Sequence, residues 1–536
     1  MAEPPSTKPQ QAADERQPVG QRWLEIAAIF FLFLLYVGPL TPEVNEAHYL
    51  AKARHYWNPD FAPADHFLNS GDAHGVFYWS FGWITTLVSL PVAVWIGRII
   101  CWFGIALAWH RLAWLLLPKP WSSVLLVALG LAGIHYTHMA GEWLIGGVEA
   151  KCFAYALAFW GLGDALLGRW NRAWIWLGAA SGFHVLVGGW MVVCLMFGWL
   201  ICPGHRPRLM AMLPGLFVGG AISLIGVVPL LILNWGVDSL HSGWASYVYV
   251  FERLSHHLVV HSFLAPLKIR FAVTAFAWGA TAYLLRDVPR ARILNGVVAG
   301  SMVLVLLGIA IDQFFIYWRT DYVTSAKLLR LYWFRLADVM VPLALAINLG
   351  LLVMRYRRNF PRLTKTSLIV AGLLVGVGLG VRFEERWTAT VAPADLSSQV
   401  TSPAAWEAVG KWIKTNTPTD AVFLTPRLQS TFKWYAQRAE VVTSKDVPQD
   451  DMSLLEWRER RVDIHWRPYH QRASLSLAAL TEADIRELAE EYGFQYVVVD
   501  SVLARRDRLQ PDWSFPRVYP ADAAAEADYE VYEIVP

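Results

Sequence analysis

The sequence predicts an α-helical protein that crosses a membrane many times and carries a soluble α/β domain at its C-terminal end. Of its 536 residues, 55% are hydrophobic and only 17% are charged, whereas soluble domains are charged at about a quarter of their positions. Apolar runs of the length needed to cross a bilayer recur as far as residue 381 and then stop. Charge divides in the same way, because residues 1–401 have a net charge of +9 and residues 402–536 a net charge of −6.

Composition excludes several classes of protein. The hydrophobic content excludes a disordered chain, and the absence of a basic stripe excludes nucleic-acid binding. All cysteines lie in apolar runs, so neither a disulfide framework nor a CxxC zinc site is predicted. Residues 1–22 are rich in Pro and Gln and lack a cleavable signal pattern, which predicts a disordered tail before a transmembrane domain at 23–400.

Eleven apolar segments are the predicted membrane spans. Residues 77–91 are too short to be one of them and predict a helix lying at the membrane surface. Two spans, 173–186 and 189–202, are short, and Gly188–Gly189 between them predicts a broken or re-entrant hairpin. The spans are 24–40, 93–116, 121–140, 152–168, 173–186, 189–202, 213–234, 267–285, 293–311, 333–354 and 366–381.

Lysine and arginine in the turns predict the orientation. If the N-terminus is cytoplasmic, every inner turn carries at least two basic residues, as the positive-inside rule requires. Eleven crossings then place residues 401–536 outside, in the periplasm of a bacterium whose inner membrane holds the spans.

The C-terminal segment alternates strand and helix patterns, which predicts a partly parallel sheet. It contains no GxGxxG, P-loop or GxSxG motif, so a structural role or acceptor recognition is favoured over catalysis. The predicted helices are 403–415, 454–462 and 481–492, and the predicted strands are 421–425, 440–443, 496–500 and 529–534.

The first outer loop, residues 41–92, concentrates acidic side chains: Glu43, Glu46, Asp60, Asp65 and Asp72. Glu46 begins a predicted helix at the membrane face, where desolvation raises the basicity of a carboxylate. For Glu46 a functional role and a solvated surface role are weighed equally, and for Glu43 and Asp60 the surface role is preferred.

The second outer loop places Glu149 and Lys151 at the mouth of an apolar span, where an unpaired charge is costly. A functional role is favoured for both over a snorkelling lysine and an acidic rim, and Glu142 is a weaker candidate. His184, at the outer tip of the short hairpin, is more often a hydrogen-bonded core residue than a ligand.

The third outer segment carries Arg253, His256 and His257 in an amphipathic stretch suited to phosphate recognition. His257 and His261 have the i, i+4 spacing of metal ligands, but no carboxylate or cysteine completes this ligand set, so no zinc site is predicted.

In the fourth outer segment, Lys327, Arg330 and Arg335 approach the start of a span. Arginine and lysine bind phosphate through charge-assisted hydrogen bonds, so a lipid phosphate is one ligand of this segment. Headgroup contact, or an i, i+3 pair between Arg335 and Asp338, is the equal alternative.

Three short motifs carry a resemblance to a known family. They are P-x-x-N-E-A-x-Y-x-x-x-A at Pro42–Ala53, the arginine of VWIGR at Arg98, and the glutamate of GGVEAK at Glu149. With the layout of spans and C-terminal domain, they resemble the GT-C glycosyltransferases, which include protein O-mannosyltransferases, oligosaccharyltransferases and the aminoarabinose transferase of lipid A. Asn45 departs from this pattern, because the family commonly has Asp there as the catalytic base.

The resemblance implies an enzyme that transfers a sugar from polyprenyl phosphate to an acceptor hydroxyl on a glycan, lipid or protein, with inversion. A loop carboxylate, Glu46 or else Asp65 or Asp72, would be the base, and Glu149 is a further residue predicted to be catalytic. It leaves open a divalent cation (Mg²⁺ or Mn²⁺) held by Glu46 and Glu149. The side chains predicted to bind the donor and its phosphate are Lys151, His184, Arg253, His256, His257, Arg330 and Arg335.

Two other functions are weighed. A flippase or transporter of lipid-linked sugars would favour charges at the bilayer midplane and internal repeats, and the sequence shows Asp164 and no repeat. A non-catalytic scaffold, or an enzyme that has lost activity, would not require acids clustered in the first two outer loops.

Overall fold

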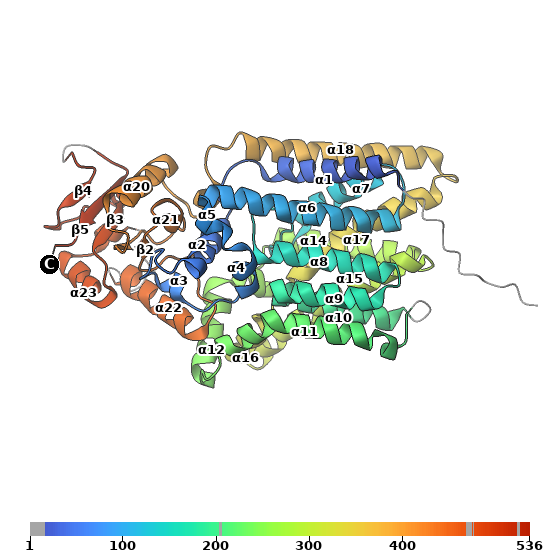
Figure 1. Ribbon diagram of the computed structural model, residues 1–536, viewed down its shortest axis with the longest axis horizontal. Coiled ribbons are helices and arrows are strands. Elements are labelled where there is room, and N and C mark those ends of the chain that lie inside the picture. The colour runs from blue at the N-terminus through green and yellow to red at the C-terminus, as the bar shows by residue number, and fades with distance from the viewer. Residues whose placement is uncertain (1–16, 203–205, 468–473, 475, 523–525, 536) are drawn as a thin grey trace, which may run out of the picture.

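The computed structural model describes residues 17–202, 206–467, 474, 476–522 and 526–535. A bundle of long helices forms one body, and a smaller domain with a mixed sheet caps one end of it (Figure 1). Residues 1–16 of the predicted disordered tail lie outside the described residues. The last residues of the predicted tail are helical, because the first helix begins at Val19 and not at residue 24.

A helix coincides with each predicted span, although the count of eleven crossings stays a prediction. Six of these helices are long and apolar enough to cross a membrane: α1, α6, α11, α15 with its π-helical extension to Trp318, α17 and α18. The helices are α1 (Val19–Val37), α6 (Leu90–Leu116), α7 (Ser122–Thr137), α8 (Ala150–Leu166), α9 (Trp170–Phe183), α10 (Val185–Ile201), α11 (Leu209–Leu233), α14 (Ala265–Leu284), α15 (Pro289–Ile311), α17 (Arg335–Tyr356) and α18 (Pro361–Trp387).

The break in the short hairpin lies at His184, so the predicted turn at Gly188–Gly189 is wrong. His184 is extended, and its Nδ1 accepts a hydrogen bond of 3.2 Å from the backbone N–H of Val187, which caps α10. Gly188 lies inside α10, where a Cβ would come within 2.1 Å of the backbone nitrogen of Ser181. The glycine therefore permits close packing of α9 on α10 and does not form the turn.

The predicted single surface helix at 77–91 is also wrong. The segment contains the end of α4 (Gly75–Phe81), the short α5 (Ile84–Leu87) and the start of α6. Gly82 follows α4 at a crowded point, because a Cβ there would lie 2.3 Å from the Tyr78 oxygen and 3.0 Å from the Ala53 oxygen. The short helices α4 and α5, together with α2 (Glu46–Trp57) and α3 (His66–Asn69), lie between the bundle and the smaller domain (Figure 1).

The C-terminal domain has a five-stranded sheet in the order β2-β1-β3-β5-β4. β1 (Val422–Leu424) is parallel to β2 (Ala439–Glu440) and β3 (Tyr496–Asp500), whereas β5 (Tyr529–Glu533) is antiparallel to β3 and β4 (Arg517–Tyr519), so the predicted partly parallel sheet is confirmed. The predicted helices correspond to α20 (Pro403–Asn416), α22 (Asp451–Trp466) and α23 (Glu482–Tyr492); the sequence did not predict β4, α21 (Phe432–Tyr435) or α24 (Ser501–Arg506).

A buried lysine joins the two bodies. The Nζ of Lys433, in α21, lies 3.1 Å from Asp65 of the first outer loop, 2.6 Å from Glu440 and 2.6 Å from Asp446. All four side chains are buried. A buried charge of this kind is stable only when it is paired and hydrogen-bonded, so the C-terminal domain is held against the outer loop in one arrangement.

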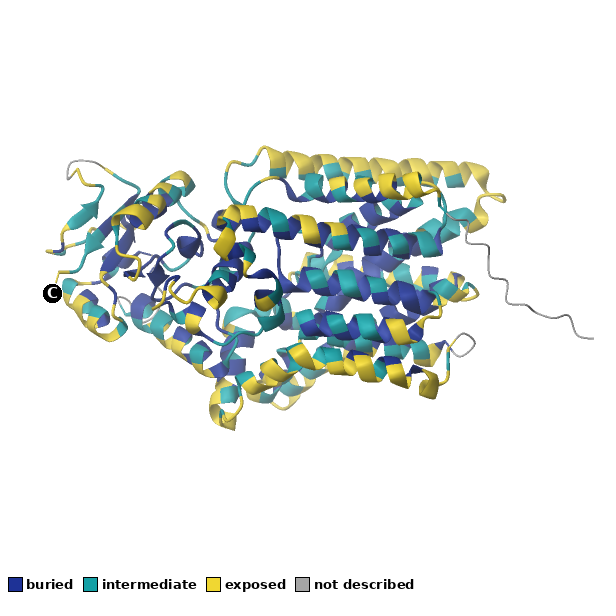
Figure 2. Ribbon diagram, in the orientation of Figure 1, coloured by how far each residue is buried: buried dark blue, intermediate teal, exposed yellow. Residues whose placement is uncertain are grey.

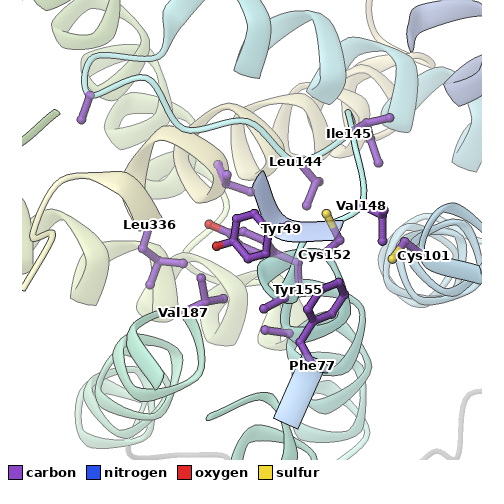
Figure 3. Packing of buried hydrophobic residues seen from close by; sticks show 14 of the residues in the cluster. Tyr49, Phe77, Cys101, Leu144, Ile145, Val148, Cys152, Tyr155, Val187 and Leu336 are labelled. Carbon is purple, nitrogen blue, oxygen red and sulfur yellow. The ribbon is translucent and has the colours of Figure 1, made fainter. Parts of the chain in front are cut away.

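Buried residues gather inside the bundle and along its junction with the C-terminal domain, whereas α18 has no buried residue (Figure 2). Near this junction Tyr49 of α2 lies among Tyr155 of α8, Val187 of α10 and Leu336 of α17 (Figure 3). The outer ends of three bundle helices and one loop helix therefore meet at a single place.

Candidate functional site

A cavity of about 270 Å³ lies at this meeting point. Its wall combines the outer ends of the bundle helices, α2 and the loop segments, and residues 445–449 of the C-terminal domain. Seven of the predicted site residues line it: Glu149, Lys151, His184, Arg253, His256, His257 and Arg335. Side chains from four separate outer segments of the sequence are therefore brought together.

Glu149 presents its carboxylate to the cavity from the residue that precedes α8. The amide Nδ2 of Asn45 donates a hydrogen bond of 2.6 Å to Oε1, and Lys151 Nζ lies 3.8 Å from Oε2. Asn45, which replaces the family's usual aspartate, therefore orients Glu149. An aspartate at this position would set two carboxylates side by side, an arrangement in which both are hard to ionise.

A chain of alternating charge continues from Lys151. Its Nζ lies 3.0 Å from Oε1 of Glu142, and Oε2 of Glu142 lies 3.4 Å from Nη1 of Arg335. Lys151 also lies 3.7 Å above the ring of Trp143, and Arg335 lies 4.4 Å above the ring of Tyr332. Both cations are thereby held in place at the wall, since each is fixed by a carboxylate and an aromatic face.

A second cationic group faces this chain. Arg253 donates from Nε to the backbone oxygen of Ser444 at 2.9 Å, and Lys445 follows directly in the C-terminal domain. Burial, followed by the nearby charge of Arg253, lowers the pKa of Lys445 to about 8. Arg253 and Lys445 are like charges in a partly desolvated place, which is unfavourable until an anion joins them.

Histidines complete the wall. The Nδ1 of His257 lies 2.7 Å from the backbone oxygen of Ala140, and the ring of His256 packs against it. Burial lowers the pKa of His257 to about 2 and that of His74 to about 4, so both are neutral near pH 7. The ring of His184 stacks on His74, whose Nε2 lies 3.0 Å from the hydroxyl of Tyr49. Neutral rings of this kind offer hydrogen bonds and flat faces.

Glu46 does not line the cavity. It is fully buried, and its oxygens accept hydrogen bonds from the backbone N–H groups of Glu43 (2.7 Å) and Val148 (2.9 Å) and from Nε (2.8 Å) and Nη2 (2.7 Å) of Arg98. Four donors occupy the carboxylate, which joins the first outer loop to the second and to α6.

Three other predicted site residues also lie outside the cavity lining. Asp65 caps α3 through Leu68 N–H and pairs with Lys433. Asp72 lies 3.5 Å from Lys52. Arg330 donates to Asp451 at 2.5 Å and to the backbone oxygen of Gln449 at 2.9 Å. Asp65 and Asp72 therefore serve the first outer loop and its junction with the C-terminal domain, and Arg330 joins the fourth outer segment to that domain.

The alternative pair between Arg335 and Asp338 is wrong. Asp338 accepts hydrogen bonds from the backbone N–H groups of Met139 (2.7 Å), Ala140 (2.9 Å) and Glu142 (3.2 Å). It therefore anchors the second outer loop and leaves Arg335 to face Glu142 and the cavity.

The residues present do not fit the divalent cation that the resemblance left open. The carboxylate of Glu46 already accepts hydrogen bonds from Arg98 and from backbone N–H groups. The carboxylate of Glu149 accepts a hydrogen bond from Asn45 and lies beside the positive charge of Lys151. Within the described part of the chain, no group of three or more His, Cys, Asp or Glu side chains is placed to hold a metal ion. No step proposed below uses one.

The sequence interpretation missed several residues of the cavity wall. Lys445 lies in an irregular segment of a domain without catalytic motifs, so no local signal marked it. Tyr249 and Tyr332, whose hydroxyl groups are 2.7 Å apart, come from different outer segments. The motif at Pro42–Ala53 did mark Asn45, but only as a residue that stands in place of a catalytic base. The sequence did not predict that Asn45 donates a hydrogen bond to Glu149.

Comparisons with known proteins give matches of limited reach. A family described as a domain of unknown function (DUF6798) matches residues 404–464, within the C-terminal domain. No curated protein sequence matches the chain. Among solved structures, the chain is similar to the arabinofuranosyltransferase AftD from Mycobacteria, with 14% identity and a TM-score of 0.46, over 97% of this chain and 40% of that one.

A second similar structure is the oligosaccharyltransferase of Archaeoglobus fulgidus, with 12% identity and a TM-score of 0.44, over 89% of this chain and 69% of that one. By name both proteins are glycosyltransferases, the class that the sequence motifs resemble.

Proposed function

We propose that the protein is an integral-membrane glycosyltransferase that moves a sugar from a polyprenyl-phosphate donor to an acceptor hydroxyl. The observation that carries this proposal is the composition of the cavity wall. Two carboxylates line the cavity: Glu142 lies between Lys151 and Arg335, whereas Glu149 is held by the amide of Asn45. Arg253 and Lys445 also line the cavity. A sugar phosphate needs a base for the attacking hydroxyl and cations for the phosphate that leaves.

Glu149 is the proposed base. It accepts the proton of the acceptor hydroxyl while the oxygen attacks the anomeric carbon, and the bond from that carbon to the phosphate oxygen breaks. One displacement inverts the anomeric centre. Asn45 sets the orientation of the carboxylate through its 2.6 Å hydrogen bond, and a positioned base of this kind contributes about 10²–10⁴-fold to rate.

The leaving polyprenyl phosphate gains negative charge as the bond breaks. Lys151, Arg335, Arg253 and Lys445 line the cavity in which this charge develops, and fixed cations in a partly dry site stabilise it without reorganisation. His256, His257 and His184 face the same space and are proposed to hold the sugar and phosphate oxygens. Glu46, Asp65 and Arg330 are proposed as positioning residues.

A transporter is the less supported function. Asp164, the acidic group expected at midspan, is paired with Arg111 at 2.5 Å and with Arg172 at 3.3 Å. Its neighbour Arg172 belongs to a predicted inner turn, so this cluster lies at a helix end and supplies no charge for a path through the membrane.

Activity and its pH dependence test the proposed function. Purified protein given a polyprenyl-phosphate sugar is expected to release polyprenyl phosphate as the sugar passes to an added saccharide hydroxyl, or slowly to water when no saccharide is added. The kcat/KM is expected to fall as the pH rises through about 8, because Lys445 then loses its charge. The groups that act on Lys445 are Arg253, Arg335, Glu149 and Asp446. The phosphodiester of the donor does not titrate in this range, so the decline reports on the protein.

Variants of Lys445 test whether this residue causes the decline of kcat/KM with rising pH. Lys445→Met is expected to lower kcat/KM by about 10- to 100-fold, the value of one hydrogen bond to a charged group. Lys445→Arg is expected to keep activity and move the decline to higher pH, since arginine stays protonated. Lys411→Met, on the exposed side of α20, is the control. An unchanged decline in Lys445→Arg would refute the role of Lys445, and release of no polyprenyl phosphate from any donor would refute the function.

We also propose that the protein lies in the inner membrane with a cytoplasmic N-terminus and a periplasmic C-terminal domain. Supporting this, the start of α1 lies at the end of the bundle remote from that domain (Figure 1). The native cysteines are buried, so Glu459→Cys on the exposed side of α22 adds one reactive thiol. An impermeant maleimide added to spheroplasts is expected to label it, and labelling only after lysis would reverse the orientation.

A further inference from the structure

Three further basic side chains lie together in the C-terminal domain and do not line the cavity. Trp457, Arg461 and His465 follow one another at i, i+4 and i+8 on α22 and therefore share one face. Arg427, from the loop after β1, lies against the same helix, with its guanidinium carbon 5.9 Å from the ring centre of Trp466, and its charge lowers the pKa of Arg461 and His465. We call Arg427, Arg461 and His465 the α22 cluster.

The arginines of α22 differ in their partners. Arg458 donates to Glu252 at 2.9 Å, and Arg460 donates to Glu456 at 2.6 Å. Arg461 instead lies 4.3 Å above the ring of Trp457, and its buried Nε has no hydrogen-bond partner among the described residues. Arg458 and Arg460 are therefore each paired with a carboxylate, whereas Arg461 forms no ion pair with the residues that the structure describes and lies on an aromatic ring.

The same lack of partners extends to the rest of the α22 cluster. Within the described ranges, the buried Nε of Arg427, the Nε2 of His465 and the hydroxyl of neighbouring Ser444 have no hydrogen-bond partner. His465 is only 2% exposed. Buried polar atoms are nearly always satisfied, so several unsatisfied polar atoms close together point to an acceptor that the described residues do not supply.

Positive charge predominates at this place, although Glu252 also acts on Arg461. Burial, followed by Arg427 and Arg461, lowers the pKa of His465 to about 3, and burial followed by Arg253 lowers the pKa of Arg461 to about 10. Two guanidinium groups and a neutral imidazole can bind an oxyanion through charge-assisted hydrogen bonds. Such an anion would offset the repulsion between the arginines.

Backbone hydrogen bonds connect the α22 cluster to the cavity. The N–H of Ser444 donates to the backbone oxygen of Arg427 at 3.0 Å, and the oxygen of Ser444 accepts from Arg253 Nε at 2.9 Å. Arg253 lines the cavity, as does Lys445, the residue after Ser444. Ser444 therefore connects Arg427 of the α22 cluster to Arg253 of the proposed phosphate site.

We propose that the α22 cluster binds an oxyanion group of the acceptor, so that the acceptor is an acidic saccharide carrying phosphate or carboxylate. The bound anion holds the acceptor on the C-terminal domain while a hydroxyl farther along it reaches Glu149. The identification of the bound molecule as the acceptor rests on the proposed function, whereas the anion site itself does not.

Binding to the full-length protein in detergent tests the site. The probes are trigalacturonate for carboxylate, mannose 6-phosphate for phosphate, and neutral maltotriose. Calorimetry without any donor is expected to show binding of at least one anionic probe and none of maltotriose. Carboxylate and phosphate sources are distinguished by which probe binds more tightly.

Variants locate the binding. Arg461→Gln and Arg427→Gln are each expected to weaken the anionic probe by about 10-fold or more, since a bond to a charged group contributes about 1.5–3 kcal/mol. Arg460→Gln, the next residue of α22 with its charge paired to Glu456, is the matched control. Arg461→Lys keeps the charge without the planar fork and is expected to bind with intermediate affinity, and the melting temperature of each variant shows that it is folded.

Three results would overturn the proposal. These are unchanged affinity in folded Arg461→Gln and Arg427→Gln, equal binding of maltotriose, and a loss of affinity confined to Lys445→Met, which would place the anion in the cavity. The proposed function fails separately. Glu149→Gln is expected to bind the anion normally, and anion binding that depends on Arg461 in a protein without transferase activity would leave the site standing and refute glycosyl transfer.

Discussion

Glu149→Gln is expected to reduce sugar transfer by about 10²–10⁴-fold in kcat, because the amide cannot accept the proton of the attacking hydroxyl. The change keeps the size of the side chain and one oxygen that can accept from Asn45. Donor binding is therefore expected to persist, with KM changed much less than kcat. Transfer and the binding of a polyprenyl-phosphate sugar are measured side by side on detergent-purified protein.

Glu252→Gln is the matched control for this result. Glu252 also lies in an outer segment and pairs with an arginine, Arg458, but it does not line the cavity. Its substitution is expected to leave kcat within about twofold, since partly exposed ion pairs contribute little. Equal loss in both variants would indicate a general effect of outer-face charge, and full activity of Glu149→Gln would remove Glu149 as the base.

The helices and the outer-loop side chains could be predicted because their signals are local. Apolar runs marked each long helix of the bundle, and α23, predicted at 481–492, begins with a capping box between Thr481 and Asp484. Glu149 and Lys151 were marked by charge at the mouth of an apolar segment, where function or pairing must account for it. Both residues do line the cavity.

Partners distant in the sequence could not be predicted. Glu46 and Asp65 are carboxylates in outer loops, as Glu149 is. Only their contacts with Arg98 and Lys433 distinguish them from Glu149. Lys445 reaches the cavity because the C-terminal domain is docked by Lys433, which no periodicity or motif encodes. The break at His184 depends on one side-chain cap, whereas the adjacent glycines pointed to the wrong position.

Glu46→Gln is expected to lower stability far more than it lowers the activity of each folded molecule. The fully buried guanidinium of Arg98 would lose its negative partner, and breaking a buried pair from one side costs about 3–5 kcal/mol. The apparent melting temperature and the yield of folded protein are expected to drop. Transfer normalised to folded protein is expected to remain within about tenfold, since Asn45 and Glu149 stay in place.

A double variant separates this structural role from catalysis. In Glu46→Gln with Arg98→Met, no buried cation is left without a partner, and replacing a buried pair by uncharged groups is often neutral. The double variant is therefore expected to regain most of the lost melting temperature, while Arg98→Met alone is expected to be destabilised. If Glu46→Gln is instead fully stable and inactive, the base is Glu46, and Glu149 becomes the residue that positions it. That outcome would require Arg98 to release the carboxylate of Glu46 during the reaction, because in this structure Glu46 accepts four hydrogen bonds, two of them from Arg98.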